Sequence, residues 1–208
     1  MNWIHYHYQF YTISEIVSCF WYYLLNLEKL ELTNCILSRD QWTALWYCFE
    51  WHKEEVDSIV LDNNGLIDES LTRLLNGIHN NLNPVSNISI SKSEFGLSSC
   101  RILYEIIDTR LKFDQLIIDN WKIIGTALCD FFKLLTDNCN IKRLSLTGLK
   151  LNKRAVDLFI DLLESPHYIT EIDLSNTHIL PNKLEEIEKI IKSNNMKLHR
   201  TQTNDISM

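Results

Sequence analysis

Proline and glycine are scarce in this chain of 208 residues, and phosphate-binding motifs are absent. The three prolines and five glycines are too few for a collagen-like, linker-rich or turn-dense all-β protein. No two glycines stand in a G-x-G arrangement and none precedes a Lys-Ser or Lys-Thr pair, so the loops that cradle nucleotide phosphates are missing. The sequence therefore argues against these fold classes and against the common nucleotide-binding motifs.

Metal-binding and catalytic motifs are also missing. The six cysteines include no C-x-x-C pair, and the seven histidines include no H-E-x-x-H motif. His5 and His7 would share one face of a strand, but no third ligand accompanies them. No G-x-S-x-G pattern marks a Ser-His-Asp site. We therefore expect no metal or other cofactor and no enzymatic activity.

The chain lacks an excess of positive charge and a long apolar run. Its 20 Lys and Arg oppose 27 Asp and Glu, a net charge of −7, which argues against a nucleic-acid partner. The N-terminus has no basic segment of the kind found in signal peptides, and the apolar run at 16–25 is too short to span a bilayer. We interpret the scattered cysteines as reduced thiols, and we expect a cytoplasmic protein without membrane insertion.

Most of the acidic excess lies between residues 38 and 69. This segment holds eight acids against two bases, Arg39 and Lys53. The acids are Asp40, Glu50, Glu54, Glu55, Asp57, Asp62, Asp68 and Glu69. They form either a solvated helix face, which we favour, or a docking patch for a basic partner.

What the sequence does contain is one apolar pattern, L-x-x-L-x-L-x-x-(N/C)-x-L, six times in succession. Its copies begin at Leu27, Val56, Val85, Phe113, Ile141 and Ile169, at spacings of 28 or 29 residues. Each copy opens with the period-2 alternation of a half-buried strand and is followed by a helical stretch. Ser38 with Gln41 predicts a capping box, Asn152 predicts a helix cap, and Pro181 predicts the first turn of the last helix.

The pattern resembles leucine-rich repeats of the ribonuclease-inhibitor type over about residues 27–195. That resemblance implies an α/β leucine-rich repeat solenoid, a horseshoe with a parallel concave sheet and convex helices. We expect one domain, a monomer, in which residues 1–26 form an aromatic-rich N-terminal cap and 27–195 form six repeats. Residues 196–208 are expected to be a polar, frayed tail.

The N/C position of each copy normally supplies a polar side chain where the strand turns toward the helix. Cys35, Asn64, Ser93 and Thr177 can hydrogen-bond there. Trp121 and Leu149 are not expected to satisfy these backbone groups. We therefore expect distorted turns in the fourth and fifth units.

Strand residues between the inward-facing aliphatics should point out of the concave face, which makes that face the candidate partner-binding surface. It is nearly neutral and rich in hydrogen-bonding groups, and Val60 and Ile117 are its large apolar residues. The last column of outward residues is rich in asparagine, either because asparagine tolerates turn conformations or because it contacts a partner. The candidate partner-binding residues are Glu31, Val60, Asp62, Asn63, Ser89, Ser91, Lys92, Gln115, Ile117, Asp119, Asn120, Arg143 and Asp173.

Together these observations favour a non-enzymatic protein–protein interaction module with an unidentified protein partner. It could be an adaptor or scaffold, the sensor domain of a larger protein, or an effector secreted into a host cytoplasm, since its Ile, Asn and Lys content is typical of AT-rich genomes. The alternative is a GTPase-activating protein resembling the Ran type. That activity would need an exposed arginine or asparagine, and Arg143 is the outward-facing arginine.

Overall fold

The computed structural model describes residues 29–35, 37–51, 57–80, 85–109 and 113–205, and side chains throughout these ranges except at 47–51 and 196–205. The expected N-terminal cap at 1–26 lies outside the described residues. The strands are β1 (Lys29–Thr33), β2 (Ser58–Asp62), β3 (Asn87–Ile90), β4 (Glu94–Phe95), β5 (Phe113–Ile117), β6 (Lys122–Ile123), β7 (Ile141–Ser145) and β8 (Glu171–Asp173). The helices are α2 (Arg39–Trp51), α3 (Asp68–Asn80), α4 (Leu97–Asp108), α5 (Ala127–Asp137), α6 (Lys153–Glu164) and α7 (Pro181–Asp205).

The main sheet has six parallel strands in the order β1-β2-β3-β5-β7-β8, so strands that follow one another in the repeat pattern are neighbours. Equivalent positions of the sequence pattern face one another: Glu31 is opposite Val60, which is opposite Ser89. The same alignment continues through Ile117 to Ser145 and on to Asp173. The predicted α/β class, the parallel sheet and the strand register are therefore confirmed.

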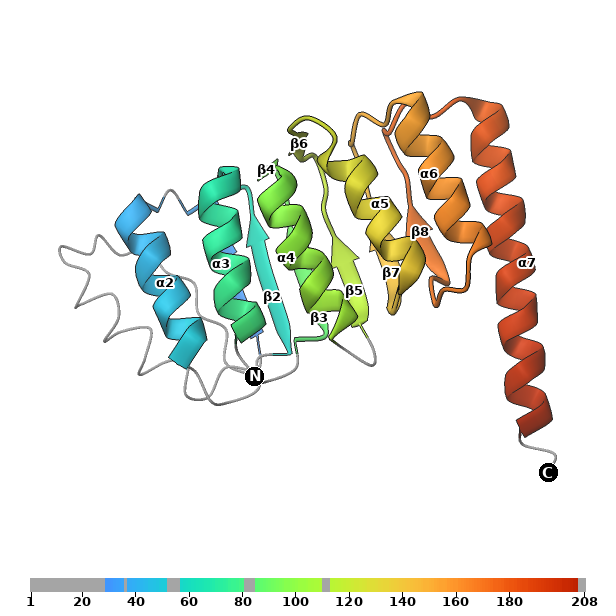
Figure 1. Cartoon of the computed structure of the whole chain (residues 1–208), viewed down its shortest axis with the longest axis horizontal. Coiled ribbons are helices and arrows are strands. Elements are labelled where there is room, and N and C mark those ends of the chain that lie inside the picture. The colour runs from blue at the N-terminus through green and yellow to red at the C-terminus, as the bar shows by residue number, and fades with distance from the viewer. Residues whose placement is uncertain (1–28, 36, 52–56, 81–84, 110–112, 206–208) are drawn as a thin grey trace.

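Helices α2 to α7 stand in a row along one face of this sheet (Figure 1). Strand residues that alternate toward the helices are buried, as in β2, where Ile59 and Leu61 have no exposed surface. The helices bury matching apolar stripes; in α6 the stripe includes Val156, Phe159 and Leu163. Burial of these two apolar faces against each other forms the core and fixes which side of each strand faces away from the helices.

An aromatic cluster joins the units near the middle of the core. The Phe95 ring centroid lies 4.6 Å from that of Trp121 and 5.7 Å from that of Phe131. The ring centroid of Phe132, the residue after Phe131, lies 5.0 Å from that of Phe159 in α6. Contacts of this kind couple neighbouring units, because a single unit cannot bury its apolar face alone.

Polar groups at the strand-to-helix turns reach from one unit to the next. The predicted caps are present: Ser38 Oγ accepts from Gln41 N at 3.3 Å, and Asn152 Oδ1 accepts from Ala155 N at 2.9 Å. Asp68 Oδ1 accepts from Gly96 N at 2.8 Å and from Ser99 Oγ. Asp68 therefore stabilises the start of α4 in the following unit.

The expected distortion at Trp121 is wrong. The Trp121 indole Nε1 donates to the carbonyl oxygen of Ile90, as Asn64 Nδ2 donates to the equivalent carbonyl of Leu32 at 2.9 Å. Strand β6, which directly follows Trp121, also pairs with β4 of the preceding unit in a short parallel ladder. At Leu149 the side chain is buried, and the turn is closed by a backbone hydrogen bond from Leu149 N to the Leu146 carbonyl.

The last helix runs into the segment that the sequence predicts to be a polar, frayed tail, residues 196–208. Helix α7 begins at Pro181 and continues without a break to Asp205, and it extends past the other helices in Figure 1. No proline or glycine follows Pro181 in the chain, so nothing in the backbone chemistry ends the helix at the last repeat.

Candidate functional site

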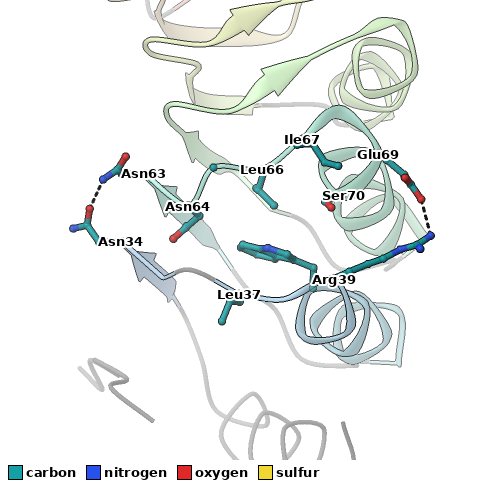
Figure 2. Close-up of a pocket in the computed structure, with 11 residues that line it drawn as sticks. Asn34, Leu37, Arg39, Asn63, Asn64, Leu66, Ile67, Glu69 and Ser70 are labelled. Atoms are coloured by element: carbon teal, nitrogen blue, oxygen red, sulfur yellow. Dashed lines mark hydrogen bonds and ion pairs between the residues drawn. The ribbon is translucent and has the colours of Figure 1, made fainter. Parts of the chain in front are cut away.

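The sheet face opposite the helices is the candidate site, and we call it the open sheet face. None of the described elements covers it, and Figure 2 shows the strands on one side and the helices on the other. Parallel sheets are normally covered on both faces. With six strands at about 4.8 Å spacing, this face is on the order of 25 Å wide.

The central column of this face combines polar and aliphatic side chains. Val60 and Ile117 are half-buried, with Ser89 between them in register. At the two ends of the column are acids: Glu31, whose carboxylate lies 3.1 Å from Lys29 Nζ, and the exposed Asp173. The predicted apolar anchors therefore lie in the middle of the column, within a polar surround.

The asparagine-rich column has a structural role. Its six residues all have positive φ between 50° and 71°: Asn34, Asn63, Lys92, Asn120, Gly148 and Asn176. In several units the N–H of this residue donates to a backbone carbonyl of the next unit, as from Asn120 N to Thr147 O at 2.8 Å. Asparagine and glycine adopt this left-handed conformation at least cost, so the turn explanation of the column is confirmed.

Asparagine side chains also link units along this edge. Asn63 Nδ2 donates to Asn34 Oδ1, and Asn63 N donates to Ser91 Oγ at 3.3 Å. Ser91 is only 8% exposed. Of the candidate residues, Ser91 therefore offers almost no surface to a partner, while Asn63, Lys92 and Asn120 are exposed.

Asp119 is held in a hydrogen-bond network at the ends of the strands. Its Oδ1 accepts from Ser145 Oγ at 2.6 Å and from Thr147 N at 3.0 Å. Burial raises the pKa of Asp119, with the charges of Asp173 and Asp62 adding to the effect and the two hydrogen bonds opposing it. Ser145 and Thr147 lie at outward-facing positions but are not among the predicted site residues, because their contacts with Asp119 join two units and no local pattern indicates them.

The other candidates are spread along the sheet. Gln115, Arg143 and Glu171 are paired in register across β5, β7 and β8, and Arg143 and Gln115 are half-buried. Asp62, at the end of β2, is half-buried as well. The structure thus places all thirteen predicted residues on one sheet and its strand-end edge. Ser91 is among them but is buried.

No group of three or more His, Cys, Asp and Glu side chains among the described residues is arranged to hold a metal ion. Within the same ranges, none of the helices has the length and apolar character needed to cross a membrane.

Comparison with known proteins finds similarity at the level of structure. No family model and no curated protein sequence matches this chain. The fold is similar to the tropomodulin C-terminal domain from Caenorhabditis elegans, with a TM-score of 0.57 at 9% identity over 92% of this chain and 98% of that one. It is also similar to actin-binding site 2 of leiomodin-1, with a TM-score of 0.52 at 11% identity over 96% of this chain and all of that one.

These comparisons overturn the assignment to the ribonuclease-inhibitor type of repeat. The similar structures are tropomodulin and leiomodin domains, and no family model of any repeat type matches. The assignment failed because the apolar pattern indicates which positions are buried, and it does not identify the protein family. A strand facing inward and a helix packed behind it require aliphatic residues at these positions, whichever protein family the unit belongs to. The fold that this chain shares is that of the tropomodulin and leiomodin-1 domains.

Proposed function

We propose that this chain is a non-enzymatic protein-interaction module that binds a protein partner on its open sheet face. The observation that carries the proposal is the open face itself, six parallel strands wide and lined by outward polar side chains around Val60 and Ile117. A surface of this width can supply the roughly 800 Å² that one partner contributes to a standard protein interface.

The shape of the module belongs to the same proposal. We infer a leucine-rich-repeat-like solenoid whose open sheet face is the inner, concave side of a horseshoe. The regular register from β1 to β8 supports it, because each unit contacts its neighbours through the same strand pairs. A concave surface would surround a partner on two sides and bury more area than a flat one.

Actin is the first partner to test. The leiomodin-1 domain with this fold is described as an actin-binding site. At 11% identity a shared fold does not imply a shared binding partner. Actin is therefore a candidate whose binding has to be measured. The open sheet face has acids at Asp62, Asp119 and Asp173, so binding should weaken with added salt if the partner surface is basic.

The experiment compares two double variants by affinity capture and by co-sedimentation with actin. Val60→Ser with Ile117→Ser removes both apolar anchors from the open sheet face. Leu97→Ser with Ile124→Ser makes similar aliphatic-to-serine changes away from the main sheet, at the start of α4 and just after β6, where these residues are 50% and 43% exposed. We expect the first pair to weaken partner binding at least tenfold, about 1.4 kcal/mol, and the second pair to leave it unchanged. Equal capture by both variants would contradict the proposal.

A further inference from the structure

Exposed cations and an exposed leucine gather where the fifth and sixth units turn from strand to helix. We call this surface the basic turn patch; its members, all exposed, are Lys150, Lys153, Arg154, His178 and Leu180. Leu180, at 67%, is the most exposed large hydrophobic residue among the side chains that the structure describes. The patch shares no residue with the candidate partner-binding residues of the open sheet face.

The two units that form the patch are in direct contact. Gly148 N, just before the patch, donates to the Ser175 carbonyl at 2.9 Å. Lys183 Nζ lies 3.8 Å from Asp157 Oδ1, which links α7 and α6 near their starts. Figure 1 shows the turns that lead into these two helices at the same edge of the molecule. The basic turn patch is therefore one continuous surface across both units.

The charge of the patch is positive and is not neutralised by the protein itself. The two turn segments, 148–154 and 176–183, contain four lysine or arginine residues and no aspartate or glutamate. One of the four, Lys183, pairs with Asp157 and Glu186. The three cations of the patch take part in no ion pair with the residues that the structure describes. Such a surface is complementary to a segment rich in carboxylates.

Two of these cations lie where a helix disfavours them. Lys153 and Arg154 are the first two residues of α6, whose first turn holds no acid. The backbone N–H groups give the start of a helix a partial positive charge, so cations there reduce stability and acids increase it. Helices α2 and α3 follow this rule, with acids in their first turns. Folding alone therefore gives no reason for the two cations.

Leu180 is also unfavourable for folding. Its carbonyl accepts from Leu184 N at 3.1 Å and α7 begins at Pro181, so Leu180 is the N-cap of α7. Leucine is a poor N-cap because its side chain cannot accept a hydrogen bond from the first turn. The equivalent residue of the fifth unit, Asn152, accepts from Ala155 N at 2.9 Å. An exposed leucine here therefore needs a reason other than helix stability.

His178 has a backbone conformation that costs energy for a residue with a side chain. Its φ is 58°, in the left-handed region, and the equivalent position of the second unit is Gly65, with φ of 61°. Glycine adopts this conformation without the steric penalty that a Cβ brings. Cations, leucine and histidine at this one patch thus all oppose folding. Breaks of local rules that gather at one place are typical of functional surfaces.

We propose that the basic turn patch binds an acidic segment of a partner protein that carries an aliphatic side chain beside its carboxylates. The aliphatic side chain packs on Leu180, and the carboxylates lie over the three cations of the fifth unit. The imidazole of His178 can donate a hydrogen bond to one of them. This contact does not use the open sheet face, so it and the proposed function can fail independently.

A protein segment fits the patch better than an anionic membrane does. A flat membrane would meet the whole edge at which the helices begin, including the acids in the first turns of α2 and α3. The chain as a whole has a net charge of −7, which an anionic bilayer repels. A short segment covers the last two units alone and avoids both costs.

The test uses fluorescein-labelled peptides and fluorescence anisotropy at pH 7 and low salt. The probe is Gly-Leu-Leu-Glu-Glu-Glu-Glu-Gly; one comparison peptide replaces its glutamates by lysine and another replaces its leucines by serine. We expect saturable binding of the probe, weaker binding of the serine peptide and none of the lysine peptide. Absence of saturable binding at millimolar protein, or equal binding of either comparison peptide, would overturn the proposal.

A matched pair of variants locates the apolar contact. Leu180→Ser should weaken binding of the probe roughly fivefold or more, while the melting temperature rises by about 2 °C because serine can cap α7. Ile67→Ser makes the same kind of change at the N-cap of α3, where Ile67 is 51% exposed and its carbonyl accepts from Leu71 N at 2.9 Å. It should leave binding unchanged. Equal losses in both variants would overturn the proposal, as would a melting temperature that falls with Leu180→Ser.

A second pair locates the charge. Lys153→Glu should weaken binding of the probe roughly tenfold and raise the melting temperature by about 2 °C, because an acid suits the start of α6. Lys189→Glu makes the same change of charge at an exposed position inside α7 and should leave binding nearly unchanged. If both variants lose binding equally, only the net charge matters and the patch is not the site.

Two further measurements identify the occupant. Co-sedimentation with vesicles of phosphatidylserine and phosphatidylcholine should show no binding that Leu180→Ser removes; such binding would identify a membrane as the occupant and contradict the proposal. Analytical ultracentrifugation should give the same mass for wild type and Leu180→Ser. A dimer that is lost in Leu180→Ser would identify a second copy of this chain instead, and would also contradict the proposal.

Discussion

The Trp121 indole nitrogen donates to the main-chain carbonyl of Ile90, one unit earlier in the chain. Asn64 makes the equivalent bond to Leu32, which also lies one unit earlier. Trp121 therefore makes the hydrogen bond that asparagine makes in the second unit. Its ring centroid also lies 4.6 Å from that of Phe95. One residue here links two units by both a hydrogen bond and an apolar contact.

Trp121→Phe should lower the free energy of unfolding by about 1–3 kcal/mol, because it keeps a ring in the core and removes the donor to a buried carbonyl. Urea denaturation would measure this loss as a lower midpoint, provided that the m-value is the same for the variant and the wild type. Tyr168→Phe, at a residue that is 61% exposed, is the control and should change stability by less than 0.5 kcal/mol, the usual limit for surface sites. A Trp121→Phe protein as stable as wild type would show that the hydrogen bond contributes nothing.

The strand and helix pattern could be predicted from sequence because it depends on local burial. Residues such as Leu30 and Leu32 alternate inward within one strand, and the repeat spacing then aligns every strand with the next. The family could not be predicted, since unrelated families with this unit bury the same positions. The Trp121 bond was missed for a different reason: the indole N–H reaches a carbonyl 31 residues away, and no local pattern encodes that distance.

The candidate site was predictable in outline. Outward strand positions such as Val60 and Ile117 follow from the period of two, and the structure places them in one column. The burial of Ser91 and the network around Asp119 depend on side chains from the next unit. A pocket lined by Leu37, Trp42 and Leu66 depends on two turns that lie 29 residues apart in sequence, so only the assembled units reveal it.

Leu144→Asp should unfold the units cooperatively. Leu144 is 2% exposed on β7, and burial of an unpaired carboxylate costs several kcal/mol, comparable with the whole stability of a domain. Lys142→Asp, at an exposed position of the same strand, is the control and should remain folded. Circular dichroism would measure both; a Leu144→Asp melt within a few degrees of wild type would contradict the register.

Stability should decline as pH falls below about 6.5 because of His167. Its Nδ1 accepts from Ile169 N at 2.9 Å and its Nε2 lies 2.9 Å from the Leu163 carbonyl, so the folded protein holds the neutral ring. Burial lowers the pKa of His167 below its ordinary 6.5. The unfolded chain therefore binds the proton first, and the loss begins near the unfolded pKa and ends at the folded one. Urea midpoints from pH 8 to 5 measure it, and His167→Asn should flatten this part of the profile.

Gly148→Ala should destabilise the protein more than Gly125→Ala. Both glycines have positive φ, 71° and 61°, so both substitutions carry the same conformational cost of about 1 kcal/mol. A Cβ at Gly148 would also meet the Asn120 side-chain amide, whereas a Cβ at Gly125 meets nothing within 4 Å. Thermal melts of the two variants measure the difference. Equal losses would show that Asn120 moves aside freely.

Asp119→Asn should raise stability at neutral pH, although it removes a charge from a hydrogen-bonded residue. Because the pKa of Asp119 is raised in the folded state, chiefly by burial, its ionised form is less favourable there than in the unfolded chain. Stability from this group is therefore greatest below the unfolded pKa of 3.8 and is lost as pH rises through the folded pKa. Asparagine keeps an Oδ1 acceptor for Ser145 and Thr147 and carries no charge, so the gain over wild type should grow from pH 3.5 to pH 7.

Asp173→Asn gives the opposite sign and serves as the matched control. Hydrogen bonds from Ser175 lower the pKa of Asp173, so its ionised form is favoured in the folded state and its neutralisation should slightly reduce stability at pH 7. This carboxylate is exposed, and solvent screening keeps the loss small. Urea midpoints at pH 3.5 and 7 would measure both variants. If the two substitutions shift stability in the same direction, the burial of Asp119 cannot be what distinguishes these two acids of the open sheet face.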